Sequence, residues 1–287
     1  MKTTLYMLKE TSPYMMSFVI TTERNRCIVI DGGRAEDMPD LKACIGGRTV
    51  AAWILTHPHT DHISGFVAEM EKNGCYDFDV ERVYYRFPDY DAWVARADEA
   101  PDREYFLWDL NEMLPAFNRI RHRFAHKEHL VEAGEKLRVD EVEIEFLYTT
   151  CDGLFANPIN DSSLVFKLSS PRKSVLFLGD LGPDGGDMLY RMARHKLKAD
   201  VVQMAHHGHM NVSMEVYAAI DPKACLWSAP RWLYEEEEVP QYLADEAKLI
   251  RMKRTRMYGT AVTRRWMECL GVKEHYVSGD GMQTVLL

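Results

Sequence analysis

The stretch Thr56-His57-Pro58-His59-Thr60-Asp61-His62-Ile63-Ser64-Gly65 places three histidines and one aspartate side by side at residues 57–62. It follows an almost wholly apolar run of strand length, Val50–Leu55. Beyond the polar residues, apolar side chains recur at three- and four-residue spacing over 61–72. These patterns predict a strand covered on both faces, then a polar junction, then a helix.

The residue types at this junction indicate a metal site, because neutral imidazoles and carboxylates are the ligands of zinc, iron and manganese. His57 and His59 alternate along an extended segment, so both can face one side. Asp61 and His62 begin the expected helix and can face a second ion, and a helix N-terminus favours the carboxylate. A polar surface loop is the alternative, but this density of ligand types at a strand–helix junction favours metal binding.

The rest of the chain predicts the layers around this junction. Strand patterns dominate the first third of the sequence, and from residue 136 onward strands alternate with helices. We therefore expect one domain over residues 1–287, with an α/β fold arranged as a four-layer αβ/βα sandwich. An aromatic-rich, mostly helical insertion is expected at about 89–129, a helix at 240–254, and a hairpin around Gly279-Asp280-Gly281.

Composition narrows the function and the location. The chain has 287 residues with 44 acidic and 35 basic side chains, a formal net charge of −9. Proteins that coat nucleic acid are usually basic, so that class is disfavoured. The six cysteines are scattered without a C-x-x-C pair, which argues against a disulfide framework or a zinc ribbon. No stretch reads as a signal peptide or a membrane span, so we expect a cytoplasmic protein without a membrane partner.

The histidine-rich stretch resembles the H-x-H-x-D-H hallmark of the metallo-β-lactamase superfamily, and further segments follow in the family's order. Asp31-Gly32-Gly33 resembles the early Asp-Gly turn that orients the site. Phe177-Leu178-Gly179-Asp180 resembles the segment whose aspartate bridges two metals. Met204-Ala205-His206-His207-Gly208 resembles the late His-His-Gly segment. The resemblance implies a sandwich of two sheets with a dinuclear metal centre.

One segment departs from the common pattern, because many members place a histidine where this chain has Asn160-Asp161-Ser162-Ser163-Leu164-Val165. This segment is similar to one in the hydrolase domain of bacterial competence (DNA-uptake, ComEC/Rec2-like) proteins. Asp161 can act there as an oxygen ligand, which would favour a harder metal such as manganese, or the segment is only a turn that enters a strand. The family's Tyr-Gly-His-Pro segment is replaced by residues 231–240, so only the hydrolase module is implied.

The resemblance also implies a ligand set and a mechanism. Two divalent metal ions are expected, with zinc ahead of manganese or iron. A hydroxide shared by the two ions would be the nucleophile, Asp61 would belong to the catalytic centre, and His207 would donate a proton or stabilise the leaving oxygen. Asp31 would fix the tautomer of a histidine. The implied ligands of the first metal are His57, His59, Asp180 and Asp161, and those of the second are Asp61, His62, His206 and Asp180.

These expectations favour a metal-dependent hydrolase that acts on a phosphodiester or another anionic ester. A thioester, lactone or amide hydrolase on the same scaffold is one alternative, and a non-catalytic metal-binding regulatory protein is another. A small-molecule or phosphoester substrate fits the net charge better than nucleic acid does. The aromatic insertion can form a lid, core packing or a homo-oligomer interface, and its helical spacing favours packing or an interface. Arg119, Arg121, Arg123 and Lys127 can steer phosphates or form a solvated helix face.

Overall fold

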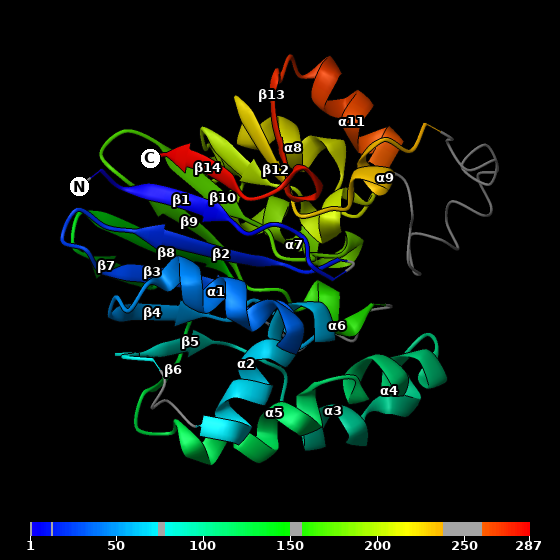
Figure 1. Cartoon of the computed structure of the whole chain (residues 1–287). Helices are drawn as coiled ribbons and strands as arrows, with labels where there is room; N and C mark the ends of the chain where they lie inside the picture. Colours follow the sequence, from blue (N-terminus) through cyan, green and yellow to red (C-terminus); the bar gives the residue numbers. More distant parts are fainter. Residues whose placement is uncertain (1, 13, 74–77, 150–156, 238–259) are drawn as a thin grey trace.

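Two sheets of seven strands each lie face to face, and helices cover their outer faces (Figure 1). The computed structural model describes residues 2–12, 14–73, 78–149, 157–237 and 260–287. The sequence prediction of a four-layer αβ/βα sandwich is confirmed. The predicted helix at 240–254 lies outside the described residues.

The first sheet contains the strand that leads into the histidine-rich stretch. Strands β3, β4, β5 and β6 run parallel to one another. Strands β14, β1, β2 and β3 pair in antiparallel fashion. In spatial order the strands are β14 (Gln283–Leu286), β1 (Thr4–Met7), β2 (Ser17–Thr21), β3 (Cys27–Asp31), β4 (Val50–Ile54), β5 (Val83–Tyr85) and β6 (Glu128–Leu130).

The second sheet mirrors this arrangement. Strands β10 to β13 are parallel to one another, and β7, β8, β9 and β10 form an antiparallel meander. In spatial order the strands are β13 (Glu274–Val277), β12 (Ala224–Trp227), β11 (Val201–Gln203), β10 (Ser174–Phe177), β9 (Val165–Ser169), β8 (Val142–Tyr148) and β7 (Lys136–Val139).

Helices form the two outer layers and the insertion. Figure 1 shows α1 and α2 over the first sheet, α7, α8 and α11 beside the second, and α3 to α5 grouped below the first. The bounds are α1 (Met38–Ile45), α2 (Thr60–Asn73), α3 (Tyr90–Ala95), α4 (Arg103–Asn111), α5 (Leu114–Ile120), α6 (Pro158–Asp161), α7 (Pro183–Ala193), α8 (Met214–Ile220), α9 (Arg231–Tyr234) and α11 (Thr260–Cys269).

The apolar pattern of β3 explains why helices are needed on the outside. Ile28 and Ile30 belong to the core between the sheets, whereas Cys27 and Val29 belong to the core beneath α1 and α2. Successive side chains of a strand point to opposite faces, so a strand that is apolar at every position must be covered on both. The insertion has an apolar cluster of its own that includes Trp93, in agreement with the predicted packing role of its aromatic residues.

The predicted hairpin around Gly279-Asp280-Gly281 is wrong. Strand β13 before this turn is the edge of the second sheet and pairs with β12, whereas β14 after it is the edge of the first sheet and pairs with β1. The turn therefore carries the chain from one sheet to the other. Because β14 pairs with β1, the two ends of the chain lie side by side (Figure 1). Within the described residues, no helix combines the length and apolarity needed to span a bilayer.

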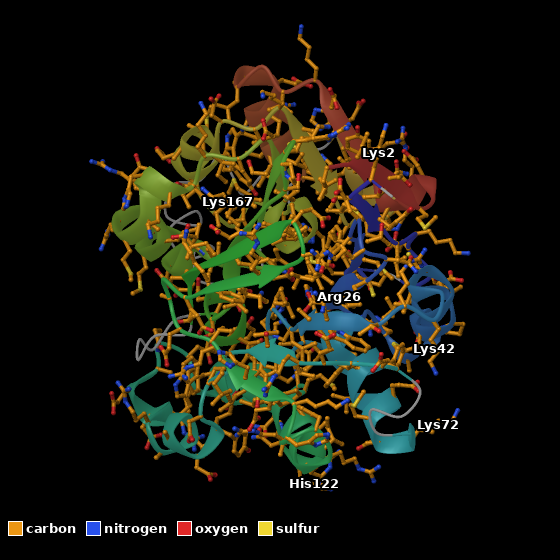
Figure 2. The ribbon with its side chains drawn as sticks, turned by 90° about the vertical axis from the view of Figure 1, so that its left-hand side faces the viewer. Lys2, Arg26, Lys42, Lys72, His122 and Lys167 are labelled. Atoms are coloured by element: carbon orange, nitrogen blue, oxygen red, sulfur yellow. The ribbon has the colours of Figure 1, made fainter. Side chains whose placement is uncertain are left out.

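A charged clamp joins the two sheets through the turn before β3 and the turn between β7 and β8. Arg26 (labelled in Figure 2) donates to Asp140 through two nitrogens, with Nη2–Oδ1 at 2.8 Å and Nε–Oδ2 at 3.2 Å. Thr22 Oγ1 also donates to Asp140 Oδ2, at 2.7 Å. Asp140 has a φ of 54°, a left-handed conformation that aspartate and asparagine tolerate better than most residues. These hydrogen bonds with the Arg26 guanidinium hold the pKa of Asp140 below its ordinary value.

We expect Asp140→Asn to lower the free energy of unfolding by about 1–2 kcal/mol at neutral pH, because it removes a charge-assisted pair without straining the turn. A carboxylate whose pKa is lowered on folding stabilises the fold at pH values above its unfolded pKa, which is about 3.9. The difference in stability between wild type and variant should therefore disappear as the pH falls below this value and through the pKa of the folded state. Asp221→Asn is the matched control, since Asp221 has a φ of 51° but pairs with Lys198 on the surface. Equal losses for the two variants in urea unfolding would contradict the clamp.

Candidate metal centre

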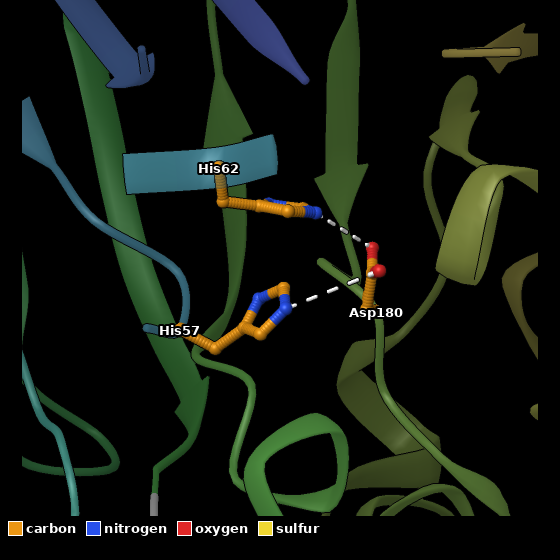
Figure 3. Close-up of side chains that lie close together, drawn as sticks. All are labelled: His57, His62 and Asp180. Atoms are coloured by element: carbon orange, nitrogen blue, oxygen red, sulfur yellow. Dashed lines mark ion pairs between the residues drawn. The ribbon is translucent and has the colours of Figure 1, made fainter. Parts of the chain in front are cut away.

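The ligand-type side chains gather at the carboxyl ends of parallel strands, where α/β sheets usually bind ligands. His57 and His59 follow β4, Asp180 follows β10, and His206 and His207 follow β11. Strands β10 and β11 are neighbours in the second sheet, and β4 belongs to the first, so the centre lies where the two sheets meet. Figure 3 shows His57, His62 and Asp180 converging there.

Asp31 organises the histidine-rich stretch from the end of β3. Its Oδ1 accepts a hydrogen bond from the Thr56 backbone N–H at 2.7 Å, and its Oδ2 accepts one from Thr56 Oγ1 at 2.7 Å and one from His62 Nδ1 at 2.7 Å. Because Thr56 donates its only hydroxyl proton to Asp31, Oγ1 acts as acceptor toward His57 Nδ1 at 3.1 Å. His57 and His62 therefore donate from Nδ1, and each directs its Nε2 inward.

His59 has the opposite tautomer. Its Nε2 lies 2.9 Å from Asp109 Oδ1, a carboxylate oxygen that accepts the proton. Its Nδ1 lies 3.2 Å from His57 Nε2, so the bare nitrogens of the two rings face each other. In a tetrahedral site with metal–nitrogen bonds of about 2.0–2.1 Å, two nitrogen ligands lie about 3.3–3.4 Å apart. The spacing of His57 and His59 therefore fits two ligands of one cation, whereas two bare lone pairs alone would repel.

The neighbours His206 and His207 differ in the same way. His207 Nδ1 donates to the Ser228 carbonyl at 2.7 Å, so its Nε2 is the nitrogen that faces the cluster. Asn211 Nδ2 faces both the Asp180 carbonyl, at 3.3 Å, and His206 Nδ1, at 2.7 Å. A carbonyl accepts only, so this atom is the amide nitrogen and donates to His206. His206 consequently carries its proton on Nε2.

The distances between these groups define a compact cluster around Asp180. Its Oδ1 lies 3.2 Å from His62 Nε2, and its Oδ2 lies 3.3 Å from His207 Nε2 and 3.9 Å from His57 Nε2. Asp61 Oδ2 lies 3.2 Å from His207 Nε2. Among the described residues, three sets of side chains could each hold a metal ion: His57 with His62 and Asp180, Asp61 with His62 and His207, and His59 with Asp109 and Glu112. Asp180 belongs to the first set and lies 3.3 Å from His207 of the second, so it stands where a bridging ligand would lie.

The residues present fit metal ions. His62 Nε2, His207 Nε2 and Asp180 Oδ1 are buried and make no hydrogen bond of ordinary geometry. Buried polar atoms without a partner destabilise a fold, and these three atoms come together from different elements. Nitrogen and carboxylate oxygen are also the donors that zinc and iron take. A divalent cation at this place would satisfy every one of these atoms.

The electrostatics of the cluster also favour a bound cation. Burial holds the pKa of His57 well below its ordinary value, so this ring is neutral and able to bind a metal. Burial opposes ionisation of Asp180, but the imidazoles of His62, His207 and His206 hold its pKa well below the usual range. Burial would likewise lower the pKa of His207, yet Asp180 and Asp61 raise it to about 10, so without a cation this ring also carries a proton on Nε2, which a bound metal ion would displace. The carboxylates therefore attract positive charge to the centre of the cluster.

The backbone of the His-His-Gly segment is forced into an uncommon shape that aims both rings. His206 has a φ of 49° and His207 a φ of 57°, both in the left-handed region, which is costly for residues other than glycine. Gly208 follows with a φ of 89°, and a Cβ there would lie 2.3 Å from the Trp227 ring. Only glycine fits this position, so Trp227 and Gly208 together fix the path of the segment.

The structure brings most of the sequence-predicted site residues together. His57, Asp61, His62 and Asp180 belong to two neighbouring sets of potential ligands, and His59 contacts His57. The structure groups His207, and not His206, with Asp61 and His62, and His206 Nε2 lies 3.7 Å from Asp180.

Asp161 is held by other contacts, and its Oδ2 is buried without a hydrogen bond. Its Oδ1 accepts from the Gly185 N–H at 2.7 Å, at the start of α7, and its carbonyl accepts from Tyr148. Asp161 belongs to none of the ligand sets found among the described residues. Its role as a metal ligand stays a prediction.

Two acidic residues of the insertion were missed by sequence reasoning. Asp109 contacts His59, and Glu112 Oε1 accepts from the Thr60 backbone N–H at 3.0 Å. Asp109 lies 50 positions from His59, so no local spacing connects them. One signal was available: Asp109 falls between the buried Phe106 and Leu110 on the apolar side of α4, where a charged residue is unusual.

The exposed side of the cluster is bounded by aromatic rings. The side chains of Asp61 and His206 are 17% and 12% exposed, whereas those of His57 and His62 are fully buried. Tyr14 packs edge-on against His207 with ring centroids 5.5 Å apart, and Trp232 packs against Tyr14 at 6.0 Å. Trp232 is largely exposed. Of these four side chains, solvent therefore reaches only Asp61 and His206.

The basic run of the insertion is engaged in ion pairs. Arg119 lies 3.7 Å from Glu71, and Arg121 Nε lies 2.6 Å from Glu128. Both arginines line a cavity of about 810 Å³ together with Trp93 and other residues of the insertion. Much of their charge is therefore balanced locally, which weakens the role of steering phosphates that the sequence left open.

Comparisons with known proteins identify the family. No curated protein matches the sequence. The structure is similar to CmlA, a diiron β-hydroxylase from Streptomyces venezuelae (14% identity, TM-score 0.57, 100% of this chain and 54% of that chain). It is also similar to the metallo-beta-lactamase fold protein YhfI from Bacillus subtilis (11% identity, TM-score 0.53, 99% and 100%). These likenesses concern the fold alone. Residues 16–220 match the family model of the metallo-beta-lactamase superfamily, and the chain therefore belongs to that superfamily.

Proposed function

We propose that this chain is a metal-dependent hydrolase that uses two divalent ions on a phosphodiester or another anionic ester. The observation that supports it is the direction of four imidazoles, each of which donates one ring N–H to an acceptor outside the cluster and turns its other nitrogen inward. Superfamily members are mostly metallo-hydrolases. A cluster built only for stability would satisfy these nitrogens with protein donors.

The tautomers assign the ligands. The first ion would be held by His57 Nε2, His59 Nδ1 and Asp180, and Asp161 could add an oxygen ligand through Oδ2, which makes no hydrogen bond. The second ion would be held by Asp61, His62 Nε2, His207 Nε2 and Asp180. Imidazole-rich sets suit zinc, which is the first candidate. Iron is the second, because CmlA is a diiron protein.

The bound ions would lower the pKa of a water molecule and polarise the scissile oxygen. The chain supplies the groups around that chemistry. Asp61 is ionised, because the nearby imidazoles of His207 and His62 overcome burial and lower its pKa. Its partly exposed carboxylate can accept a proton from the attacking water. His206 keeps a proton on Nε2 and is also partly exposed, so it can donate a hydrogen bond to an anionic substrate oxygen or to the leaving oxygen.

The finer resemblance to the hydrolase domain of competence proteins supports a phosphodiester as substrate. Ser163, in the segment that carries this resemblance, accepts from the Asp180 N–H at 3.1 Å, and Leu164 N–H donates to the Thr56 carbonyl at 2.9 Å. The segment therefore fixes Asp180 and the start of the histidine-rich stretch together. A net charge of −9 favours a small phosphoester over nucleic acid.

We expect the full chain, reloaded with zinc, to hydrolyse bis(p-nitrophenyl) phosphate, and we expect EDTA to abolish the turnover and added zinc to restore it. Release of p-nitrophenolate measures the rate. Turnover of thioester or lactone substrates with none of the phosphodiester would instead support that alternative. Metal binding without turnover of any ester would support the regulatory alternative.

The assignment of the two neighbouring histidines predicts opposite phenotypes. We expect His207→Ala to weaken binding of one metal by more than about 100-fold, because a ligand is lost. We expect His206→Ala to keep both metals and to lower kcat about 100-fold, because a donor to the reacting oxygen is lost. His122→Ala is the control, since His122 is exposed at the rim of the insertion (Figure 2). Loss of a metal from His206→Ala, with His207→Ala intact, would reverse the assignment.

A further inference from the structure

Asp109 is a buried carboxylate whose two oxygens have different tasks. It is fully buried in α4, within the insertion. Its Oδ1 accepts from His59 Nε2 at 2.9 Å, and its Oδ2 accepts from the Ile159 backbone N–H at 3.0 Å. Neither partner carries a permanent positive charge. Burial of a carboxylate with such partners is costly for the fold, and an apolar residue would serve packing better.

The end of α4 holds the histidine-rich stretch at a second point. Glu112 follows α4 directly, and its Oε1 accepts from the Thr60 N–H at 3.0 Å, at the beginning of α2. Its Oε2 lies 4.0 Å from His59 Nε2. The insertion therefore contacts the stretch on both sides of the His59–Thr60 peptide. Packing of the aromatic residues around Trp93 explains neither contact.

The contact with Asp109 decides which nitrogen of His59 is available. A histidine ring that donates from Nε2 must present Nδ1 as the bare nitrogen, and this atom faces His57. Asp31 does the same for His62 through the other nitrogen. Asp31 belongs to the sheet, whereas Asp109 belongs to the insertion, so the two halves of the centre depend on different parts of the chain.

We propose that Asp109 is a positioning residue of the metal centre, which holds His59 in the tautomer and orientation that present Nδ1 to the first metal. The inference rests on the proposed function, because it concerns the same centre. Asp109 is not itself a ligand of that ion, since it binds the ring nitrogen opposite to the one that faces His57. The helical insertion is thus a working part of the centre.

The experiment compares Asp109→Ala with Asp102→Ala in the metal-free full chain, titrated with Co²⁺ against a competing chelator. Asp102 begins the same helix and accepts from the Tyr105 N–H at 3.0 Å, so its loss weakens α4 without touching His59. Visible absorption reports the coordination of the cobalt. We expect Asp109→Ala to keep two equivalents at saturation but to bind one about 10–100-fold more weakly, with an altered spectrum. We expect Asp102→Ala to match the wild type.

Wild-type affinity and spectrum in Asp109→Ala would overturn the inference, and so would the loss of a full equivalent at saturation, which would make Asp109 a ligand. If Asp109→Ala does not fold, Asp109→Asn replaces it, because the amide oxygen can still accept from His59 without the charge. We expect several-fold weaker binding and a shifted spectrum for that variant, and a result identical to the wild type would overturn the inference. Wild-type protein that binds no cobalt would overturn the proposed function itself.

Discussion

The hydrogen bond between Asp31 and Thr56 is the interaction on which the centre depends. Asp31 takes the only hydroxyl proton of Thr56, which leaves Thr56 Oγ1 as an acceptor for His57. The same Asp31 oxygen, Oδ2, also accepts a hydrogen bond from His62 Nδ1. One buried carboxylate therefore sets the tautomers of two rings. If Thr56 donated to His57 instead, the Nε2 of that ring would carry a proton and could not bind a metal. The availability of His57 Nε2 for a metal ion therefore follows from the direction of this proton.

The fold supplies the acceptors that complete this pattern. Parallel strands end at one edge, so loops from both sheets meet there, and backbone groups such as the Ser228 carbonyl become acceptors at fixed places. The strained path of His206 and His207 has a cost that the surrounding packing of Trp227 against Gly208 must offset. Backbone strain of this kind is usual at functional sites, where the orientation of a side chain matters more than the local backbone energy.

The sequence predicts what is local and periodic. The junction at His57–His62, strand β4 and helix α2 are recognisable because ligand types and apolar spacing stand together in the chain. The prediction of a hairpin at 279–281 was wrong, because the sequence on each side of the turn shows a strand but not the sheet that the strand joins. The choice between His206 and His207 depends on Ser228 and Asn211, and the contact of Asp109 with His59 spans 50 residues. Neither of these two features can be predicted from the spacing of neighbouring residues in the sequence.

We propose that the cluster around Asp180 holds two metal ions. Elemental analysis of the untagged chain, purified without chelators, tests this most directly, because it counts ions without assuming a substrate. We expect two equivalents of zinc or iron per chain. One equivalent, or none after incubation with either metal, would contradict the dinuclear centre.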